Sequence, residues 1–139
     1  MHSPTSIAHF NQQFSGKAPE EVLTYFLKAF HGKIALSSSL SIEDQMLTDL
    51  IAKIDSTTRI FTLDTGRLFP ETYSLIERTR TKYPVTLEVF FPEASEVEKM
   101  VKDEGINLFY TGIEQRKRCC NVRKMQPLKR AFQGLEVWI

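Results

Sequence analysis

Short apolar runs alternate along the chain with longer segments in which apolar residues recur at helical spacing. The runs at 34–36, 59–63, 85–91 and 135–139 predict four strands, and the segments between them predict helices. Ile34-Ala35-Leu36 is apolar throughout, which is typical of a strand buried on both faces. Because strands that alternate with helices are joined by right-handed crossovers, the order predicts an α/β fold with a parallel sheet and flanking helices.

The expected helices carry ordinary start and stop signals. Pro19-Glu20-Glu21 places a proline in the first turn and acids near the positive end of the dipole, and Gly32 ends that helix. Further helices are expected over 46–54, from Pro70, over 93–104 and over about 115–132. Residues 1–17 are polar and mixed, and we expect an N-terminal arm or short helix there, before a nucleotide-binding α/β domain over 18–139.

Length and charge narrow the class of protein. The chain has 139 residues, the size of one domain, and 18 Lys+Arg balance 17 Asp+Glu to a net charge of +1. That balance excludes a charged disordered tail and gives no bulk signal for nucleic acid or membrane surface, so neither is an expected partner. No apolar run approaches the roughly 18 residues of a membrane helix, and the N-terminus lacks a signal-peptide pattern, so we expect a cytoplasmic protein.

The last residues form an apolar run that Ile139 closes without a turn or cap. A strand is normally followed by a loop and more of the fold. We therefore expect the α/β domain to be incomplete at its C-terminal end.

The stretch Ser37-Ser38-Ser39-Leu40-Ser41 lies between a buried strand and a helix. Hydroxyl groups and free backbone N–H groups at a helix N-terminus can bind an anion such as phosphate. The glycines and the Gly-Lys-Ser/Thr of a P-loop are absent. The alternative is a serine-rich turn that caps the helix.

Asp64-Thr65-Gly66 follows the second expected strand. Ligands of parallel sheets bind beyond the carboxyl ends of the strands, where this segment and the serine stretch both lie. Its carboxylate and backbone groups could hold a ligand. The alternative is a strand-to-helix turn in which Gly66 supplies a positive φ.

Two adjacent cysteines lie among five cations in the stretch 116–124, which could fold over the same edge of the sheet. Nearby cations favour the thiolate, the form that attacks electrophiles and ligates metal. Two adjacent cysteines exclude a disulfide scaffold, and a bridge between neighbours is strained. The alternative is a pair of reduced thiols beside a solvated basic helix face.

Together and in this order, these stretches resemble the assimilatory adenylyl-sulfate and phosphoadenylyl-sulfate reductases, over roughly residues 32–139. The segment from Leu63 to Tyr73 and the Cys-Cys-x-x-Arg-Lys…Pro-Leu pattern of residues 119–128 carry the resemblance. The cysteine pair is typical of the branch that holds a [4Fe-4S] cluster and prefers adenylyl sulfate. Members without the pair generally use the 3′-phosphorylated nucleotide.

The resemblance implies an adenine-nucleotide α-hydrolase-like fold and a role for each matching residue. Ser37, Ser39 and Ser41 would lie near the phosphosulfate, and the Leu63 backbone would meet the adenine. Asp64, Thr65 and Gly66 would shape the pocket beside the cluster. Cys119 and Cys120 would be two cluster ligands, and Arg123 and Lys124 would supply positive charge to substrate and cluster.

The family reaction is reductive cleavage of the sulfonucleotide. A cysteine in a C-terminal Glu-Cys-Gly-Leu-His segment attacks sulfur and releases AMP, and thioredoxin or glutaredoxin then frees sulfite. These 139 residues contain neither that segment nor the second cysteine pair of the cluster, nor the later arginine-rich loop. We therefore expect the isolated chain to be inactive, with its nucleophile beyond Ile139.

Three other functions stay open. A related ATP pyrophosphatase or sulfurtransferase typically has a Ser-Gly-Gly-x-Asp-Ser loop, and the serine stretch here has no glycine. The chain could use 3′-phosphoadenylyl sulfate instead. It could also be a nucleotide-binding remnant that binds AMP and never releases sulfite.

Overall fold

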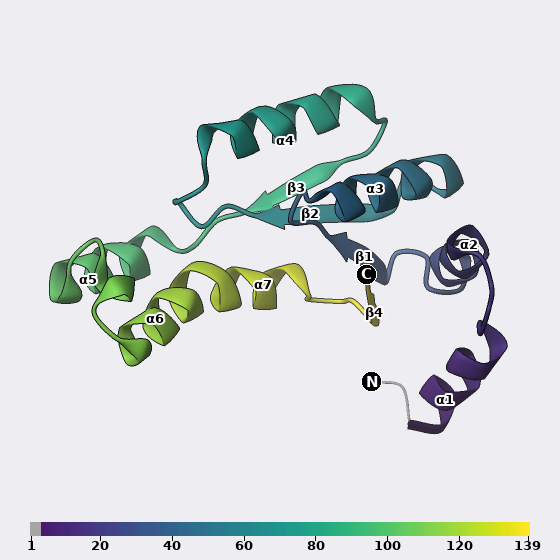
Figure 1. Cartoon of the computed structure of the whole chain (residues 1–139), viewed down its shortest axis with the longest axis horizontal. Helices are drawn as coiled ribbons and strands as arrows, with labels where there is room; N and C mark the ends of the chain where they lie inside the picture. Colours follow the sequence, from purple (N-terminus) through teal and green to yellow (C-terminus); the bar gives the residue numbers. More distant parts are fainter. Residues whose placement is uncertain (1–3) are drawn as a thin grey trace.

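The computed structural model describes residues 4–139 and contains a four-stranded parallel sheet with helices on both faces (Figure 1). The strand order is β3-β2-β1-β4. Register pairs join Ala35 to Arg59, Ile60 to Leu87 and Ile34 to Val137. The predicted α/β class and the parallel direction are confirmed. The strands are β1 (Ile34–Ser37), β2 (Arg59–Leu63), β3 (Leu87–Phe90) and β4 (Val137–Trp138).

The outer strands are shorter than the apolar runs predict. Strand β4 pairs for two residues at the edge of the sheet, and β3 ends at Phe90, two residues before Pro92. Proline has no N–H to continue a ladder, so a strand ends in front of it.

The helices begin and end close to the sequence signals. Pro19 and Pro70 are each the first residue of a helix, as expected. The helical elements are α1 (Pro4–Gln13), α2 (Pro19–Ala29), α3 (Ile42–Ile54), α4 (Pro70–Lys82), α5 (Ala94–Glu104), the 3-10 turn η1 (Leu108–Tyr110), α6 (Ile113–Cys120), η2 (Asn121–Met125) and α7 (Gln126–Ala131).

One helix expected over 115–132 is a helical run of three parts. A π-helical turn, η2, separates α6 from α7. A π turn takes one more residue per hydrogen-bonded ring than an α turn, so it changes the direction in which the following side chains point. The two cysteines lie directly before this turn, and Arg123 and Lys124 lie inside it.

The alternation of side chains along the strands builds one core on each face of the sheet. Ile34, Leu36 and Ile60 pack with buried residues of α2, α3 and α4. Ala35 and Phe61 face the other way and pack with residues of α7. This two-sided burial is what the continuous apolar runs predict.

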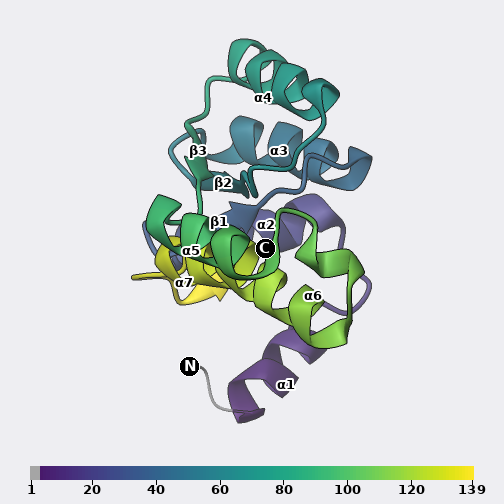
Figure 2. The same cartoon turned by 90° about the vertical axis from the view of Figure 1, so that its left-hand side faces the viewer.

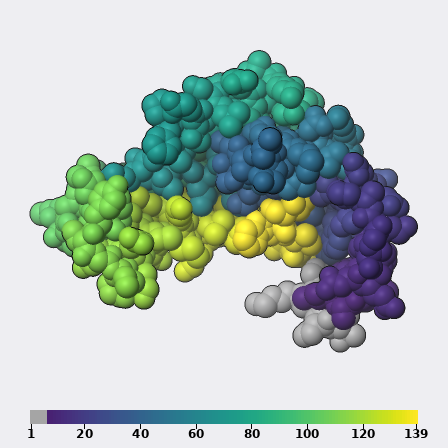
Figure 3. Space-filling model, viewed as in Figure 1, coloured from purple at the N-terminus to yellow at the C-terminus, as the bar shows by residue number. Residues whose placement is uncertain are grey.

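A third core lies outside the sheet. Met100, Leu108 and Cys119 pack together with Val122. We call residues 94–120, which form α5, η1 and α6, the cysteine lobe. It projects beyond the carboxyl ends of the strands, and the space-filling view shows it as a protrusion at one end of the molecule (Figure 3).

Helix α1 lies at the opposite end of the molecule and extends away from the sheet (Figure 2). It packs on α2 through aromatic rings, with Phe10 5.2 Å from Phe26 and Phe14 5.0 Å from Tyr25 between ring centroids. The boundary between arm and domain stays a prediction.

Candidate functional site

The serine stretch forms the connection from β1 into α3. Ser41 is the N-cap of α3, and its Oγ accepts a hydrogen bond from the Asp44 backbone N–H at 3.4 Å. Ser39 donates from both its backbone N–H and its Oγ to the Asp44 carboxylate, at 2.6 Å each. Leu40 has a φ of 64°, rare for a residue with a side chain, and its side chain is buried in the sheet core. The helix-capping interpretation is thus realised here, and the hydroxyl groups lie at a helix N-terminus as the anion-site interpretation requires.

Sequence reasoning missed Asp44. Its carboxylate lies where an anion at this helix end would accept hydrogen bonds, so it holds the Ser39 donors in place. Asp44 stands three residues after the N-cap Ser41, the spacing of a capping box. That spacing was the available signal.

The second loop runs from β2 into α4. Asp64 is 4% exposed, and its Oδ1 accepts from the Gly66 N–H at 2.7 Å and from the Tyr73 hydroxyl at 3.1 Å. The bond to Asp64 raises the pKa of Tyr73 above its ordinary value. Gly66 has a φ of 71°, as a glycine-dependent turn predicts. Tyr73 was not foreseen as a partner of Asp64.

A cavity of about 280 Å³ opens at the carboxyl ends of β1 and β2. We call it the strand-end cavity. Five residues predicted for the site line it, namely Ser37, Ser39, Leu63, Thr65 and Lys124. Ser38, Thr62, Leu68 and Thr72 complete its lining and were not predicted. The predicted residues Ser41, Asp64, Gly66 and Arg123 are not part of this lining.

A second cavity, of about 390 Å³, lies between the β2–α4 loop and the cysteine lobe. We call it the cysteine cavity, because Cys119 and Cys120 line it together with Phe109. Four cations are also part of its lining, namely Arg67, Arg116, Arg123 and Lys124. The two cavities adjoin, since Thr65 and Lys124 line both.

The two thiols differ in environment. Both are free, but Cys119 is 9% exposed within the lobe core whereas Cys120 is exposed. Within residues 4–139, no group of three or more His, Cys, Asp or Glu side chains is placed to hold a metal. The cysteine cavity therefore contains two free thiols among cations, and a four-iron cluster usually takes four thiolates.

The cations around the cysteines are not equivalent. Arg118 pairs with Asp103 at 3.2 Å and with Glu104, and these carboxylates raise its pKa. Lys117 pairs with Glu114 at 2.9 Å. Arg123 is 7% exposed, and its Nη1 donates to the Thr65 carbonyl at 2.7 Å. The side chain lines the cysteine cavity, while its buried Nε has no hydrogen-bond partner among the described residues.

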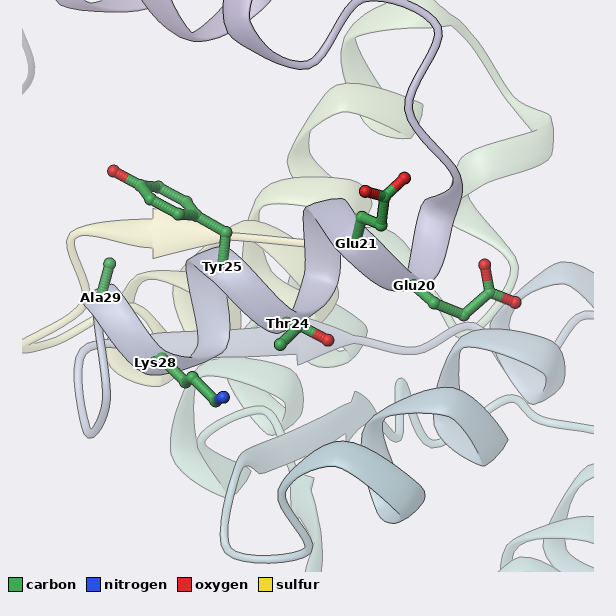
Figure 4. Close-up of a pocket in the computed structure, with 6 residues that line it drawn as sticks. All are labelled: Glu20, Glu21, Thr24, Tyr25, Lys28 and Ala29. Carbon is green, nitrogen blue, oxygen red and sulfur yellow. The ribbon is translucent and has the colours of Figure 1, made fainter.

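A larger groove, of about 740 Å³, lies along α2 and far from both loops (Figure 4). A single helix supplies all of its lining residues, namely Glu20, Glu21, Thr24, Tyr25, Lys28 and Ala29. Its charged side chains, Glu20, Glu21 and Lys28, are exposed along one helix, and no second element of the described chain converges on them. In residues 4–139 the longest helices have 13 residues, and none is long and apolar enough to cross a bilayer.

The sequence of this chain is similar to those of known proteins. Residues 33–139 match the model of the phosphoadenosine phosphosulfate reductase domain. An adenosine 5′-phosphosulfate reductase of Burkholderia cepacia is 40% identical over 109 residues, which cover 78% of this chain and 44% of the relative. A probable chloroplastic 5′-adenylylsulfate reductase of Oryza sativa is 38% identical over 128 residues, 92% of this chain and 26% of the relative.

The structure also superposes on that of a phosphoadenylyl-sulfate reductase from Candida auris in its phosphate complex. The TM-score is 0.82 at 25% sequence identity, over 99% of this chain and 66% of the other. The chain spans about half the length, or less, of the curated relatives that it matches. Because the matched residues include both strand-end loops and the cysteine pair, this chain belongs to the phosphoadenosine phosphosulfate reductase domain family.

Proposed function

We propose that the chain is the nucleotide-binding part of an assimilatory sulfonucleotide reductase, which reduces adenylyl sulfate to sulfite and AMP. We expect it in the cytoplasm, with thioredoxin or glutaredoxin as electron donor. The observation that carries the proposal is the adjoining pair of cavities, one lined by serines and one by cysteines, with Thr65 and Lys124 common to both.

In this proposal the strand-end cavity takes the nucleotide. Ser37, Ser39 and Ser41 lie near the phosphosulfate, and the backbone of Leu63 meets the adenine. Asp64, through its bonds to Gly66 and Tyr73, keeps the loop in shape. Lys124 is exposed, lines both cavities and can neutralise charge on the leaving phosphate.

The chemistry is the transfer of a sulfonate group followed by its reduction. A thiolate attacks sulfur, the S–O bond to the phosphate breaks, and AMP leaves with the bonding electrons. A dithiol then supplies two electrons, releases sulfite and becomes a disulfide. We expect the attacking thiolate in the part of the relatives that this chain does not span.

Cys119 and Cys120 are proposed as two ligands of a [4Fe-4S] cluster rather than as the nucleophile. Both line one cavity whose cations suit an anionic group, so the residues present fit part of such a site. Such a cluster would be held by Cys119, Cys120 and two further ligands, and it would supply negative charge and a polarisable group to the cysteine cavity. Arg123, buried and hydrogen-bonded to the Thr65 carbonyl, would supply positive charge to an anionic group in this cavity.

A second candidate substrate is 3′-phosphoadenylyl sulfate, which the name of the Candida auris protein favours. The names of the curated relatives favour adenylyl sulfate. A nucleotide-binding remnant and an ATP pyrophosphatase are weaker alternatives. The affinity for ATP distinguishes the pyrophosphatase from the reductase.

Calorimetric titration of this chain with adenylyl sulfate, 3′-phosphoadenylyl sulfate, AMP and ATP tests the proposal. We expect tightest binding for adenylyl sulfate. We expect about tenfold weaker binding in Ser39→Ala, because a bound phosphosulfate would take the hydroxyl proton that Ser39 donates to Asp44 in the free chain. Ser74→Ala is the matched control, since that hydroxyl bonds only to the Pro70 carbonyl within α4. Equal affinities in wild type and Ser39→Ala would refute the role of the serine loop. Preferred binding of ATP would refute the reductase.

A further inference from the structure

Arg67 connects the β2–α4 loop to the cysteine lobe. Its Nη1 donates to the Ile106 carbonyl at 3.2 Å, and its Nη2 donates to Asn107 Oδ1 at 3.1 Å. The guanidinium carbon lies 4.6 Å from the centroid of the Phe109 ring, a cation–π contact. One side chain therefore contacts three residues of a segment about 40 positions later in the chain.

The ring under Arg67 belongs to the environment of a cysteine. Phe109 packs against the lobe core that contains Cys119. Arg67, Phe109 and Cys119 also line the same cavity. One aromatic ring therefore lies between the Arg67 guanidinium and the core that includes Cys119.

The residues that Arg67 adjoins in sequence belong to the strand-end cavity. Thr65 and Leu68, on either side of Gly66 and Arg67, line that cavity. Arg123 makes a second connection, from η2 back to the Thr65 carbonyl. Arg67 thus joins the β2–α4 loop to residues 106–109 of the cysteine lobe, and Arg123 joins the same loop to the helical run that follows the cysteines. Arg67 lies outside the lining of the strand-end cavity.

We propose that Arg67 is a positioning residue, which fixes the Cys119–Cys120 helix against the loop that holds the nucleotide. This inference rests on the proposed function, because it assigns the two cavities to one reaction. Reactions between bound groups lose much of their rate when the groups shift by about 1 Å, so a rigid connection between the cavities has a direct use. The guanidinium of Arg67 suits this role, because one planar group donates to a carbonyl and to an amide oxygen and also packs on an aromatic ring.

Alkylation of the two thiols in the reduced chain, located by mass spectrometry, tests this. In Arg67→Met we expect iodoacetamide to modify the buried Cys119 about tenfold faster. The reason is that the cysteine lobe opens more often without the contacts of Arg67 to Ile106, Asn107 and Phe109. The exposed Cys120 is an internal reference and should react within about twofold of its wild-type rate. Affinity for AMP should stay within about threefold, since Arg67 does not line the strand-end cavity.

The matched control is Arg59→Met. Arg59 makes a two-pronged pair with Glu88 across β2 and β3, at 2.8 and 3.0 Å, so its loss also removes a guanidinium fork but at a distance from the lobe. We expect wild-type Cys119 reactivity in this variant. Unchanged Cys119 reactivity in Arg67→Met, or an equal increase in Arg59→Met, would overturn the inference.

The protection of Cys120 by bound AMP is a second measurement, and a purely structural role of Arg67 would leave this protection unchanged. Saturating AMP should slow Cys120 alkylation in the wild type, because the cavities adjoin, and this protection should be lost in Arg67→Met. Equal protection in both proteins would overturn the coupling. Failure of the wild type to bind AMP would overturn the proposed function, and the nucleotide-free rates would still decide on Arg67.

Discussion

Gly66 meets two demands at one position. Its φ of 71° lies in the left-handed region, and a Cβ built there would lie 3.1 Å from Arg123 Nη1. An alanine would thus strain the backbone and also press on the buried guanidinium. Since that guanidinium holds the Thr65 carbonyl, the glycine lets the loop and η2 approach each other.

We expect Gly66→Ala to lower the free energy of unfolding by about 2 kcal/mol, from backbone strain and the displaced arginine together. Gly32→Ala is the control, because Gly32 has a similar φ of 77° and no heavy atom within 4 Å of a built Cβ. It should cost about 1 kcal/mol. Urea unfolding measures both, and equal losses would show that the contact with Arg123 has no energetic effect.

The bond between Tyr73 and Asp64 predicts a pH dependence. The bond raises the pKa of Tyr73, because ionising the phenol would remove the donor and place two negative charges together. Its stabilisation is therefore fully present below the unfolded-state tyrosine pKa of about 10, and it is lost as the pH rises through the higher folded-state pKa.

Urea unfolding at pH 9 and pH 11 should accordingly show a steeper loss of stability in the wild type than in Tyr73→Phe, which has no group to ionise there. The difference between the two proteins isolates this tyrosine from the others. Parallel losses would contradict a folded-state bond between Tyr73 and Asp64.

At the scale of the elements, Arg118 joins α6 to the last turn of α5. It contacts Asp103 and Glu104, and the three side chains are between 26% and 44% exposed. We expect Arg118→Met to lower the free energy of unfolding by about 0.5–1 kcal/mol, the usual range for a partly exposed network.

That loss should shrink in high salt, because salt screens exposed pairs. Arg80→Met is the control, since it breaks a pair with Glu77 inside one helix and leaves the contact between α5 and α6 intact. Urea unfolding at low and high salt measures both variants. A loss of stability that is independent of salt would show that Arg118 acts by packing rather than by charge.

The boundary between α6 and α7 illustrates what pattern reading misses. Apolar spacing over 115–132 indicates a helix but does not distinguish an α turn from a π turn, because one inserted residue changes the spacing little over so short a run. The π turn matters, since Arg123 and Lys124 lie inside it. Two of its residues have partners far away in the sequence, since Val122 packs in the lobe core and Arg123 bonds to the Thr65 carbonyl.

For the whole molecule, the sequence was sufficient to predict where strands and helices alternate and that the strands run parallel. It also predicted that two loops meet at the edge formed by the carboxyl ends of the strands. The rule that ligands lie beyond the carboxyl ends of parallel strands accounts for the last of these. It was not sufficient for the contacts made by Asp44, Tyr73 and Arg67. Asp44 and Tyr73 contact the loops that precede their own helices, five and nine positions earlier, and these contacts depend on the exact path of each loop. The partners of Arg67 lie about 40 positions later in the chain and meet it only through the tertiary fold.

The central position of β1 has a consequence for synthesis. One neighbour of β1 is β2, which follows it closely in the chain, and the other is β4, which is the last of the four strands to be synthesised. The ion pair between Lys33 and Glu136, beside β1 and β4, spans 103 positions. A ribosome that adds about 5–20 residues per second leaves the β1 edge open for roughly 5–20 s. An open strand edge is a template for another nascent chain. The pace of translation between β1 and β4 therefore sets how long each new molecule is exposed to aggregation.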